Sequence, residues 1–365
     1  MQKKQIMIVS VICILLLTLC ACGTKKQEKK ADTVDFSSLS RTGSMELNYA
    51  TQYSVDEYGG DKSVEQYGAY KLVTIVDGGR FLLIPEGAAV PLNIPEDVTV
   101  LQQPLDKTYL VSTSVMDLVR QIDAMSDIRL SGTKEDGWYV EEARQAMEEG
   151  DILYAGKYST PDYELILDEG CNLAIENTMI YHNPEVKEKL EELGIPVLVE
   201  RSSYEEHPLG RMEWIRLYGV LFDAEETAEQ LFQEQVQQLD TVLTGQSVGK
   251  SAAFFYITSN GAVNVRKPGD YVAKMIELAG GSYVPKTADT DENALSTMNM
   301  QMETFYAEAK EADCLIYNST IEGELQTMDE LLQKSPLLKD FKAVKSGNVW
   351  CTGKNMFQET MGLGD

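Results

Sequence analysis

The stretch TYLVSTSVMDLVRQIDAM, residues 108–125, decides the fold. Its first part, residues 108–111, is a short apolar run of the kind that forms a buried strand. Ser112, Thr113 and Ser114 follow this run, and the apolar side chains after them recur at helical spacing. A strand that passes directly into a helix is the first half of a βαβ unit, so the stretch predicts a parallel sheet in an α/β fold.

The same alternation of strands and helices recurs in two separate blocks of the chain. In the first block the predicted strands lie at residues 127–132, 171–177 and 195–203, and helices at 140–150 and 183–194 separate them. In the second block the predicted strands and helices lie at residues 252–258, 270–281, 302–312, 313–319, 328–341 and 347–353. We therefore predict two Rossmann-like α/β lobes with mainly parallel sheets and with functional loops at the carboxyl ends of the strands.

Two helical spans separate the blocks. Pro208 suits the first turn of a helix, and the apolar side chains after it recur at helical spacing. Asp223, as N-cap, and Glu226 form a capping-box pattern that opens a second helix. This helix is expected to run to about Leu243 and to be roughly 30 Å long. A rigid long helix is therefore expected to join the two lobes.

The first residues predict export and lipid attachment. A lysine pair precedes an apolar run from Ile6 to Leu19, which as a helix spans roughly 21 Å and is too short for the ~30 Å hydrocarbon core. The run ends in LCAC, residues 19–22, which resembles a lipoprotein signal. Cys22 is then expected to become the lipidated N-terminus that anchors the protein to the outer face of the cell membrane. The alternative is ordinary cleavage without a lipid.

A small β-rich segment is predicted before the first lobe, because short apolar runs alternate there with Gly, Asp and Pro. Within it, YKLVTIVDGGRFLLIPEG predicts a hairpin that turns on Asp77, Gly78 and Gly79. The predicted division of the chain is a signal peptide at 1–21, a polar tether at 22–44, the β-rich entry segment at 45–104, the N-terminal lobe at 105–207, the connecting helices at 208–244 and the C-terminal lobe at 245–365.

The charge of the chain excludes one class of partner. Lysine plus arginine number 32 and aspartate plus glutamate number 58, so the net charge is 32 − 58 = −26, which repels the phosphates of nucleic acids. Beyond the signal the cysteines are Cys171, Cys314 and Cys351, an odd number that implies no complete disulfide framework. We expect a monomer that does not bind nucleic acid.

The sequence offers little support for catalysis or for a resident metal. It contains no P-loop and no H-E-x-x-H helix. Its two histidines, His182 and His207, are too few for a zinc or manganese site unless carboxylates complete it. We therefore predict that the protein is not an enzyme and holds no intrinsic cofactor or metal. For His207, which precedes Pro208, a helix lead-in is favoured over a role as axial haem ligand.

The order and spacing of six segments carry a family resemblance. They are YLVSTSVMDLV, PDYELIL, IPVLVERSSYEEHPLGRMEWIRLYGVLF, VRKPGDYVAKMIELAGG, SPLLKDFKAVKSGNVW and NMFQETMGLGD. From about Leu72 onward the chain resembles the substrate-binding lipoproteins of ABC importers for iron-siderophores, haem and cobalamin, of the periplasmic-binding type III family. The resemblance implies two lobes that close slightly on a ligand and deliver it to a permease and its ATPase. It also implies a final helix beyond Asp365, so the C-terminal lobe is expected to be cut short.

The resemblance implies a ferric siderophore as the transported ligand, with haem or cobalamin as alternatives in the same role. The remaining interpretations are that the protein binds zinc or manganese, or that it is a purely structural surface lipoprotein. By the same resemblance, Glu164 and Glu303, one glutamate in each lobe, dock onto the permease. The alternative for both is that an acidic residue near a helix start favours the helix dipole.

The candidate ligand contacts are arginines for oxygen anions, aromatic rings for flat ligand faces, and a hydroxyl near a helix start. The alternative for each arginine, Arg201 included, is a surface ion pair, and for each ring it is core packing. The predicted ligand-binding residues are Ser112, Trp138, Tyr158, Tyr181, Tyr204, Arg211, Arg266, Tyr271 and Trp350.

Overall fold

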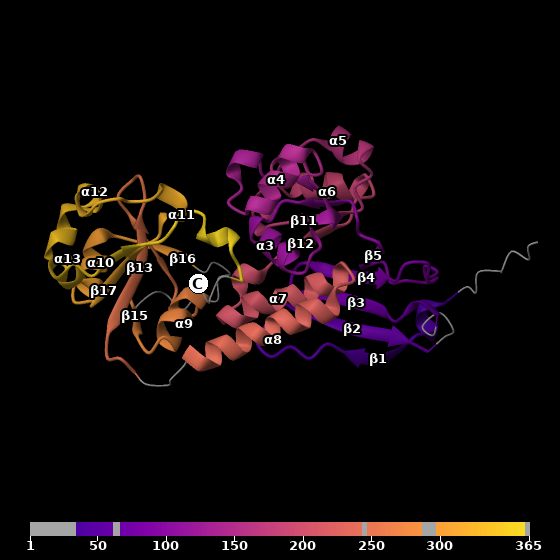
Figure 1. Ribbon diagram of the computed structural model, residues 1–365, viewed down its shortest axis with the longest axis horizontal. Coiled ribbons are helices and arrows are strands. Elements are labelled where there is room, and N and C mark those ends of the chain that lie inside the picture. The colour runs from indigo at the N-terminus through magenta and orange to yellow at the C-terminus, as the bar shows by residue number, and fades with distance from the viewer. Residues whose placement is uncertain (1–33, 61–65, 243–246, 287–296, 362–365) are drawn as a thin grey trace, which may run out of the picture.

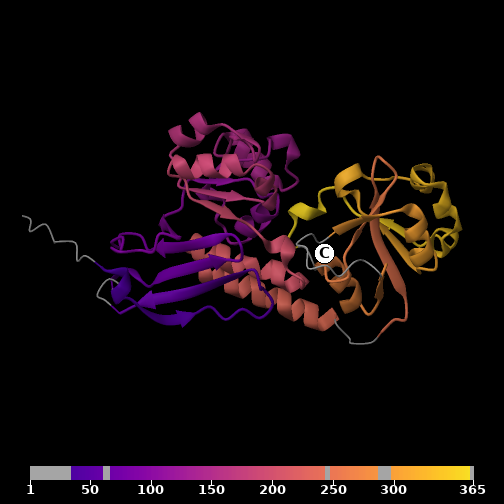
Figure 2. The same cartoon turned by 180° about the vertical axis from the view of Figure 1, so that it is seen from behind.

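The computed structural model describes residues 34–60, 66–242, 247–286 and 297–361. It contains two α/β lobes, with a long helix pair and an N-terminal sheet below the first lobe (Figures 1 and 2). This arrangement confirms the predicted fold class. Within the described residues, no helix is both long and apolar enough to cross a membrane. The signal peptide and Cys22 lie outside the described residues.

The N-terminal sheet has five strands in sequential order. They are β1 (Ser40–Ser44), β2 (Tyr53–Gly59), β3 (Tyr70–Ile75), β4 (Gly79–Ile84) and β5 (Val98–Gln102). Neighbouring strands are antiparallel except for β4 and β5, which are parallel. The predicted hairpin is confirmed, because Ile75 pairs with Gly79. Gly79 has a φ of 104°, a conformation that glycine adopts without strain.

The first lobe contains a fully parallel sheet, as the alternating pattern predicted. Its strand order is β12-β11-β6-β7-β8, and helices cover both faces. The strands are β6 (Thr108–Leu110), β7 (Ile128–Ser131), β8 (Leu153–Tyr154), β11 (Leu173–Glu176) and β12 (Val197–Val199). The helices are α3 (Thr113–Gln121), α4 (Glu141–Glu149), α5 (Tyr163–Asp168) and α6 (Pro184–Glu192), and the small hairpin β9 (Gly156–Lys157) and β10 (Thr160–Pro161) precedes α5.

Two long helices follow the first lobe. Helix α7 (Pro208–Leu221) is buried along its length, and the two residues in it that are not buried are Arg211 and Arg216. Helix α8 (Glu225–Val242) packs closely against α7, because Gly219 has no side chain: a Cβ there would lie 2.6 Å from the Cβ of Ala228. The prediction that Asp223 caps α8 is wrong. Asp223 has a φ of 57°, whereas an N-cap residue is extended.

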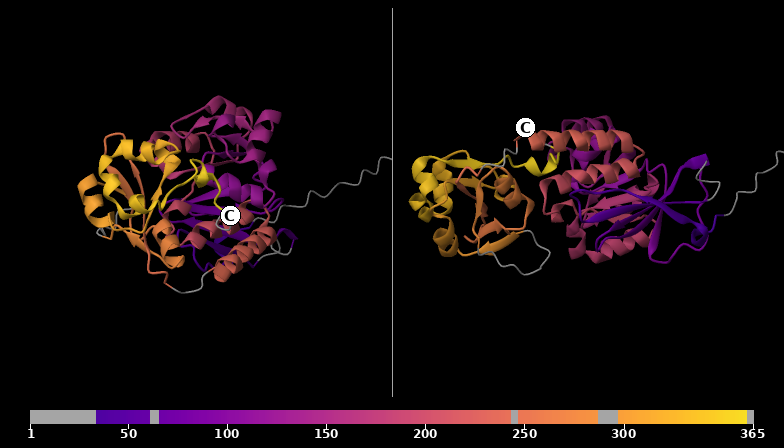
Figure 3. Two further views of the ribbon diagram at one scale, coloured as in Figure 1. Left: turned by 60° about the vertical axis from the view of Figure 1, so that its left-hand side comes forward. Right: turned by 90° about the horizontal axis from the view of Figure 1, so that it is seen from below.

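The second lobe contains a mixed sheet of six strands. The right-hand view of Figure 3 shows this lobe apart from the first. The order is β16-β14-β13-β17-β18, with β15 beside β13. The strands are β13 (Ser251–Ile257), β14 (Val263–Arg266), β15 (Ser282–Val284), β16 (Thr297–Met300), β17 (Cys314–Tyr317) and β18 (Val349–Cys351). The helices are α9 (Tyr271–Leu278), α10 (Met302–Ala309), α11 (Ser319–Glu322), α12 (Met328–Lys334) and α13 (Lys342–Ser346). Strand β14 is antiparallel to β13 because a short turn joins them, whereas parallel neighbours need a crossover.

Two buried carboxylates, Glu213 in α7 and Glu205 just before it, bind the connection between β1 and β2. Glu213, which is 0% exposed, accepts hydrogen bonds from the backbone N–H groups of residues 48, 49 and 50, at 3.0, 2.8 and 2.7 Å. Glu205, which is 1% exposed, accepts from those of residues 51 and 52, at 2.8 and 3.0 Å. These carboxylates satisfy consecutive backbone donors of residues 48–52. Apolar residues of the sheet and of the first lobe also pack in one core.

Candidate functional site

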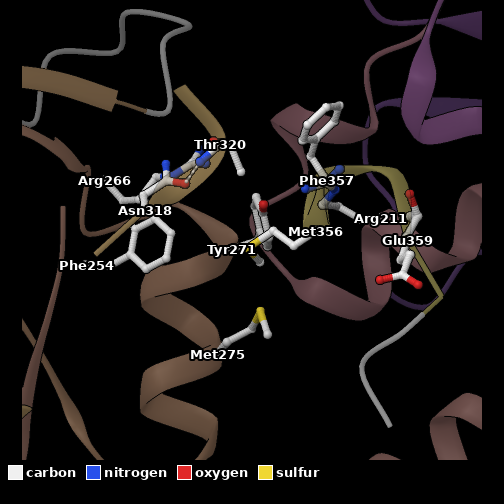
Figure 4. Close-up of a pocket in the computed structure, with 11 residues that line it drawn as sticks. Arg211, Phe254, Arg266, Tyr271, Met275, Asn318, Thr320, Met356, Phe357 and Glu359 are labelled. Atoms are coloured by element: carbon white, nitrogen blue, oxygen red, sulfur yellow. Dashed lines mark hydrogen bonds between the residues drawn. The ribbon is translucent and has the colours of Figure 1, made fainter. Parts of the chain in front are cut away.

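A pocket opens between α7 of the first-lobe side and α9 of the second lobe (Figure 4). Its volume is about 790 Å³ when the space open to solvent is included, which suits a ligand of several hundred daltons. Both lobes and the end of the chain contribute to its wall. The lining residues are Arg211, Phe254, Arg266, Tyr271, Met275, Asn318, Thr320, Met356, Phe357, Glu359 and Thr360.

Two guanidinium groups lie over the ring of Tyr271, one from each side of the pocket. The Arg211 Cζ is 4.3 Å from the ring centroid, and the Arg266 Cζ is 5.7 Å from it and 5.8 Å from the centroid of Phe254. Such cation–π contacts hold the guanidinium planes while their N–H edges stay available to a ligand. Within the described residues, no acceptor reaches the buried Nε of Arg211.

Each arginine has a carboxylate near it. Arg266 lies 3.4 Å from Asp270, whose other oxygen accepts from the Val272 N–H and so caps α9. Arg211 interacts with Glu200, which is 4% exposed at the carboxyl end of β12. Burial raises the pKa of Glu200, and the positive charge of Arg211 acts in the opposite direction. The structure thus fixes both arginines by charge as well as by ring contacts.

The end of the described chain crosses from the second lobe to the first and closes one wall of the pocket (Figures 1 and 4). We name residues 355–361 the C-terminal strap. Gln358 is 2% exposed, donates to the Gly137 carbonyl at 2.9 Å and accepts from the Tyr139 N–H at 2.8 Å. Thr360 donates to the Ser114 carbonyl at 2.7 Å, and the backbone N–H of Met361 donates to Asp117 at 2.9 Å. These bonds attach the strap to the first lobe.

Replacing Gln358 by alanine is expected to loosen the strap. The change leaves the Tyr139 N–H and the Gly137 carbonyl unpaired, which costs about 1–3 kcal/mol. Hydrogen exchange of the amides of Tyr139 and Met361 measures this directly, and both should exchange faster. Gln145→Ala, at an exposed glutamine that bonds only to Glu149 among the described residues, is the matched control and should leave both rates unchanged. Equal rates in Gln358→Ala and the unmodified chain would contradict the attachment.

Of the predicted ligand-binding residues, Arg211, Arg266 and Tyr271 line the pocket together. Trp138 lies in the core of the first lobe, 4% exposed, and its Nε1 donates to Ser131. Ser112 is also buried and contacts Glu200 through its hydroxyl.

Four predicted aromatic contacts lie elsewhere. Tyr158 packs against the core under α5, and the Tyr181 hydroxyl donates to the Asp77 carbonyl at the N-terminal hairpin. The ring of Tyr204 lies 4.5 Å from the guanidinium carbon of Arg201. Trp350 is 64% exposed on the edge strand β18. None of the four is among the described residues that line the pocket.

His207 leads into a helix, as favoured. Its Nδ1 accepts a hydrogen bond of 3.1 Å from the Leu209 N–H and caps α7, and its ring stacks on Tyr49 at 4.8 Å between centroids. The lone pair of Nδ1 is therefore occupied. Elsewhere in the described chain, no group of three or more His, Cys, Asp or Glu side chains could hold a metal ion.

Protonation of His207 is expected to lower the stability of the folded chain, because a protonated Nδ1 cannot accept the hydrogen bond that caps α7. Burial and then the charge of Lys274 lower the pKa of His207 below its ordinary value of 6.5. The unfolded chain then binds more protons than the folded chain just below pH 6.5, so the stabilisation is complete above that pH and is lost as the pH falls. His207→Asn keeps a cap without titrating. Urea unfolding measures the free energy of unfolding of both chains above and below pH 6.5. As the pH falls, the unmodified chain should lose up to about 1 kcal/mol relative to His207→Asn. A difference between the two chains that does not change with pH would contradict the prediction.

Sequence reasoning missed several lining residues. Asn318 directly follows β17 and Thr320 lies in the first turn of α11, so the rule that selected Ser112 between β6 and α3 applies to both. Met356, Phe357 and Glu359 carried no such signal, because they lie in the pocket only through the long-range attachment of the strap.

One short motif resembles a hydrolase site. GQSVG, residues 245–249, has G-x-S-x-G spacing, but such a nucleophile lies in a turn from a strand to a helix. Ser247 instead is exposed between α8 and β13, so the order of elements is reversed.

A family model and two lipoproteins of known sequence match most of the chain. The family model described as "Periplasmic binding protein" matches residues 113–356. The uncharacterized lipoproteins MJ0878 and MJ0872 of Methanocaldococcus jannaschii are 26% and 25% identical to this chain; the matches cover 83% and 77% of this chain and 73% and 72% of the relatives.

Solved structures share the fold at low sequence identity. The haem-binding protein HutB of Vibrio cholerae has a TM-score of 0.57 at 16% identity, covering 71% of this chain and 94% of its own. An Fe³⁺-hydroxamate transport protein of Saccharomonospora viridis has a TM-score of 0.54 at 20% identity, covering 71% and 90%. The catecholate-siderophore binding protein VctP of Vibrio cholerae has a TM-score of 0.53 at 12% identity, covering 70% and 91%.

Proposed function

The chain belongs to the periplasmic binding protein family, and we propose that it captures a ferric siderophore between its lobes and delivers it to an ABC permease with its ATPase. The observation that carries the proposal is the meeting of Arg211 and Arg266, from opposite sides of the pocket, at the ring of Tyr271. A siderophore complex presents oxygen atoms around a bound iron, and arginine offers a planar set of donors that matches such oxygens.

The apolar wall supports the same class of ligand. Phe254, Phe357 and the thioethers of Met275 and Met356 lie around the arginines, so the organic shell of a siderophore meets rings and polarisable sulfur. An iron that is already fully coordinated by its siderophore needs no protein ligand.

Haem or cobalamin is the alternative ligand in the same role. The pocket offers Tyr271 as an axial phenolate and two methionines as thioether ligands. His207 does not favour haem, because its Nδ1 accepts the capping bond from Leu209. A histidine that binds iron through Nε2 ordinarily donates from Nδ1.

The proposed location is the outer face of the cell membrane. The relatives in Methanocaldococcus jannaschii are named lipoproteins, and the LCAC stretch that ends at Cys22 follows the pattern for lipid attachment. Glu164 and Glu303 are proposed to dock onto the permease. Both are exposed in the first turn of a helix, α5 in the first lobe and α10 in the second. Paired charges of this kind fix orientation more than they add affinity.

A thermal-shift panel tests the function. The chain without its signal and Cys22 is heated with a ferric catecholate, a ferric hydroxamate, haemin, cobalamin or zinc. A ligand at a hundred times its dissociation constant stabilises the fold by about 2.7 kcal/mol and raises the unfolding midpoint by a few degrees. A rise with a ferric siderophore supports the proposal. A rise with haemin or cobalamin alone supports the alternative, and a rise with zinc alone, or none, contradicts both.

A further inference from the structure

The charges around the pocket balance. Arg211 and Arg266 are the cationic residues that line it in the described chain, and Glu359 is the anionic one. Asp270 is paired with Arg266 at 3.4 Å. Glu359 therefore offsets one of the two positive charges from within the pocket, and the buried Asp270 offsets that of Arg266 from behind it. Glu200, which interacts with Arg211 from the buried side, adds no positive charge to this set.

The carboxylate of Asp270 is fixed at the start of α9. The residue is 5% exposed, and one of its oxygens caps α9 by accepting from Val272 at 2.9 Å. A ligand that displaced Asp270 from Arg266 would leave a carboxylate buried at the helix start with a partner lost. Because losing a partner is costly for a buried charge, we expect Asp270 to stay paired with Arg266 when a ligand binds and to offset much of its positive charge.

The carboxylate of Glu359 is held at the pocket by its neighbours. Gln358 and Thr360, on either side of it, are bonded to the first lobe. Glu359 itself is exposed and lines the pocket from the same side as Arg211 (Figure 4). A multiply charged anion in the pocket would therefore meet this carboxylate as well as Arg211.

The net negative charge of the whole protein also disfavours an anionic ligand. The net charge of the chain is −26, so an anion is repelled on approach unless the pocket itself is strongly positive. Because Glu359 and Asp270 offset the two arginines, the pocket has no excess of positive charge to attract an anion. The two arginines can still donate hydrogen bonds to the oxygens of an uncharged ligand, and the aromatic and thioether wall suits an uncharged organic surface.

We propose that the pocket selects an iron complex without net charge, of the ferric trihydroxamate class, and disfavours trianionic ferric tricatecholates. This inference rests on the proposed function, because it takes the pocket to be the site of an iron complex. It assigns to Glu359 the role of a residue that determines specificity by repelling anionic complexes.

Equilibrium titration of the purified chain with two probes tests the inference. Ferrichrome is an uncharged ferric trihydroxamate, and ferric enterobactin is a trianionic tricatecholate. Ferrichrome should bind at least about tenfold more tightly, and its affinity should change less than about twofold between low and high salt, since salt screens only charged partners.

A charge variant separates electrostatics from shape. Glu359→Gln removes one negative charge from an exposed position and should tighten binding of ferric enterobactin by about tenfold, the effect of one charge against three at short range in a watery pocket. The ratio of its affinity for ferric enterobactin to its affinity for ferrichrome should rise by about tenfold relative to the unmodified chain, because an uncharged complex gains no such electrostatic benefit. Glu148→Gln, at an exposed glutamate on α4 outside the pocket lining, makes the same charge change and should alter neither affinity.

The outcomes separate the inference from the function. Tighter binding of ferric enterobactin than of ferrichrome by the unmodified chain would overturn the inference and leave the proposed function standing. An unchanged affinity of Glu359→Gln for ferric enterobactin would overturn the role of Glu359. Binding of neither complex at millimolar concentration would overturn the inference and the proposed function together.

Discussion

Replacing Arg211 by alanine is expected to weaken binding of the iron complex by about 10- to 100-fold. Arg211 is one of the two residues of the buried helix α7 that remain accessible, and it enters the pocket with a buried Nε that no described residue accepts from. A hydrogen bond from a charged donor contributes about 1.5–3 kcal/mol, which corresponds to this loss of affinity. Isothermal titration of the variant against the best ligand of the thermal-shift panel measures the effect.

Two further variants show whether the loss of affinity comes from the guanidinium group of Arg211. Arg211→Lys keeps the charge and removes the planar set of donors, so it should recover only part of the affinity. Arg80→Ala removes an arginine that is paired with Asp97 in the N-terminal sheet, and it should bind as the unmodified chain does. Because Arg211 also offsets the charge of buried Glu200, each variant is first shown to unfold at a similar midpoint. Unchanged binding by a folded Arg211→Ala variant would remove Arg211 from the site.

Replacing Glu213 by alanine is expected to lower the free energy of unfolding by about 3–5 kcal/mol. Its carboxylate accepts from the backbone N–H groups of residues 48, 49 and 50 and pairs with Arg216 at 3.0 Å. Removal leaves the buried N–H of Ala50 and the partly buried N–H groups of residues 48 and 49 without this acceptor. Urea unfolding followed by circular dichroism measures the change, which should appear as a lower midpoint.

The control for this prediction acts on the same arginine. Glu229 pairs with the Nε of Arg216 at 2.7 Å, but its side chain is 44% exposed. Glu229→Ala should therefore cost less than about 1 kcal/mol, as exposed ion pairs do. Equal losses in Glu213→Ala and Glu229→Ala would mean that the backbone bonds of Glu213 do not stabilise the attachment of the sheet.

The fold could be predicted from sequence because its signals are local. Strand β6 (Thr108–Leu110) forms within the predicted run and α3 begins at Thr113, because apolar spacing determines each element from its own residues. The antiparallel strand β14 was not predicted. Its apolar residues alternate as in any strand, and only the short turn after β13 distinguishes its direction.

The site could be predicted only in part, because it depends on which distant side chains converge. Trp138 follows a strand in the sequence just as a cleft residue would, yet it turns into the core and bonds to Ser131. Glu359 gave no signal, because its position depends on bonds between the strap and the first lobe. Arg211 was found because arginine suits the oxygen anions of an iron complex, but the same reasoning applied equally to Arg201, which lies against Tyr204 and not among the lining residues.

The central claim is that an iron complex binds between α7 and α9 at Arg211, Tyr271 and Arg266. Crystals of the chain grown with a ferric siderophore, with diffraction measured at the iron absorption edge, test it most directly. We predict one anomalous iron peak in the pocket, with oxygen atoms of the complex within hydrogen-bonding distance of both guanidinium groups. An iron peak elsewhere on the protein, or an empty pocket in crystals saturated with a complex that binds in solution, would contradict the claim.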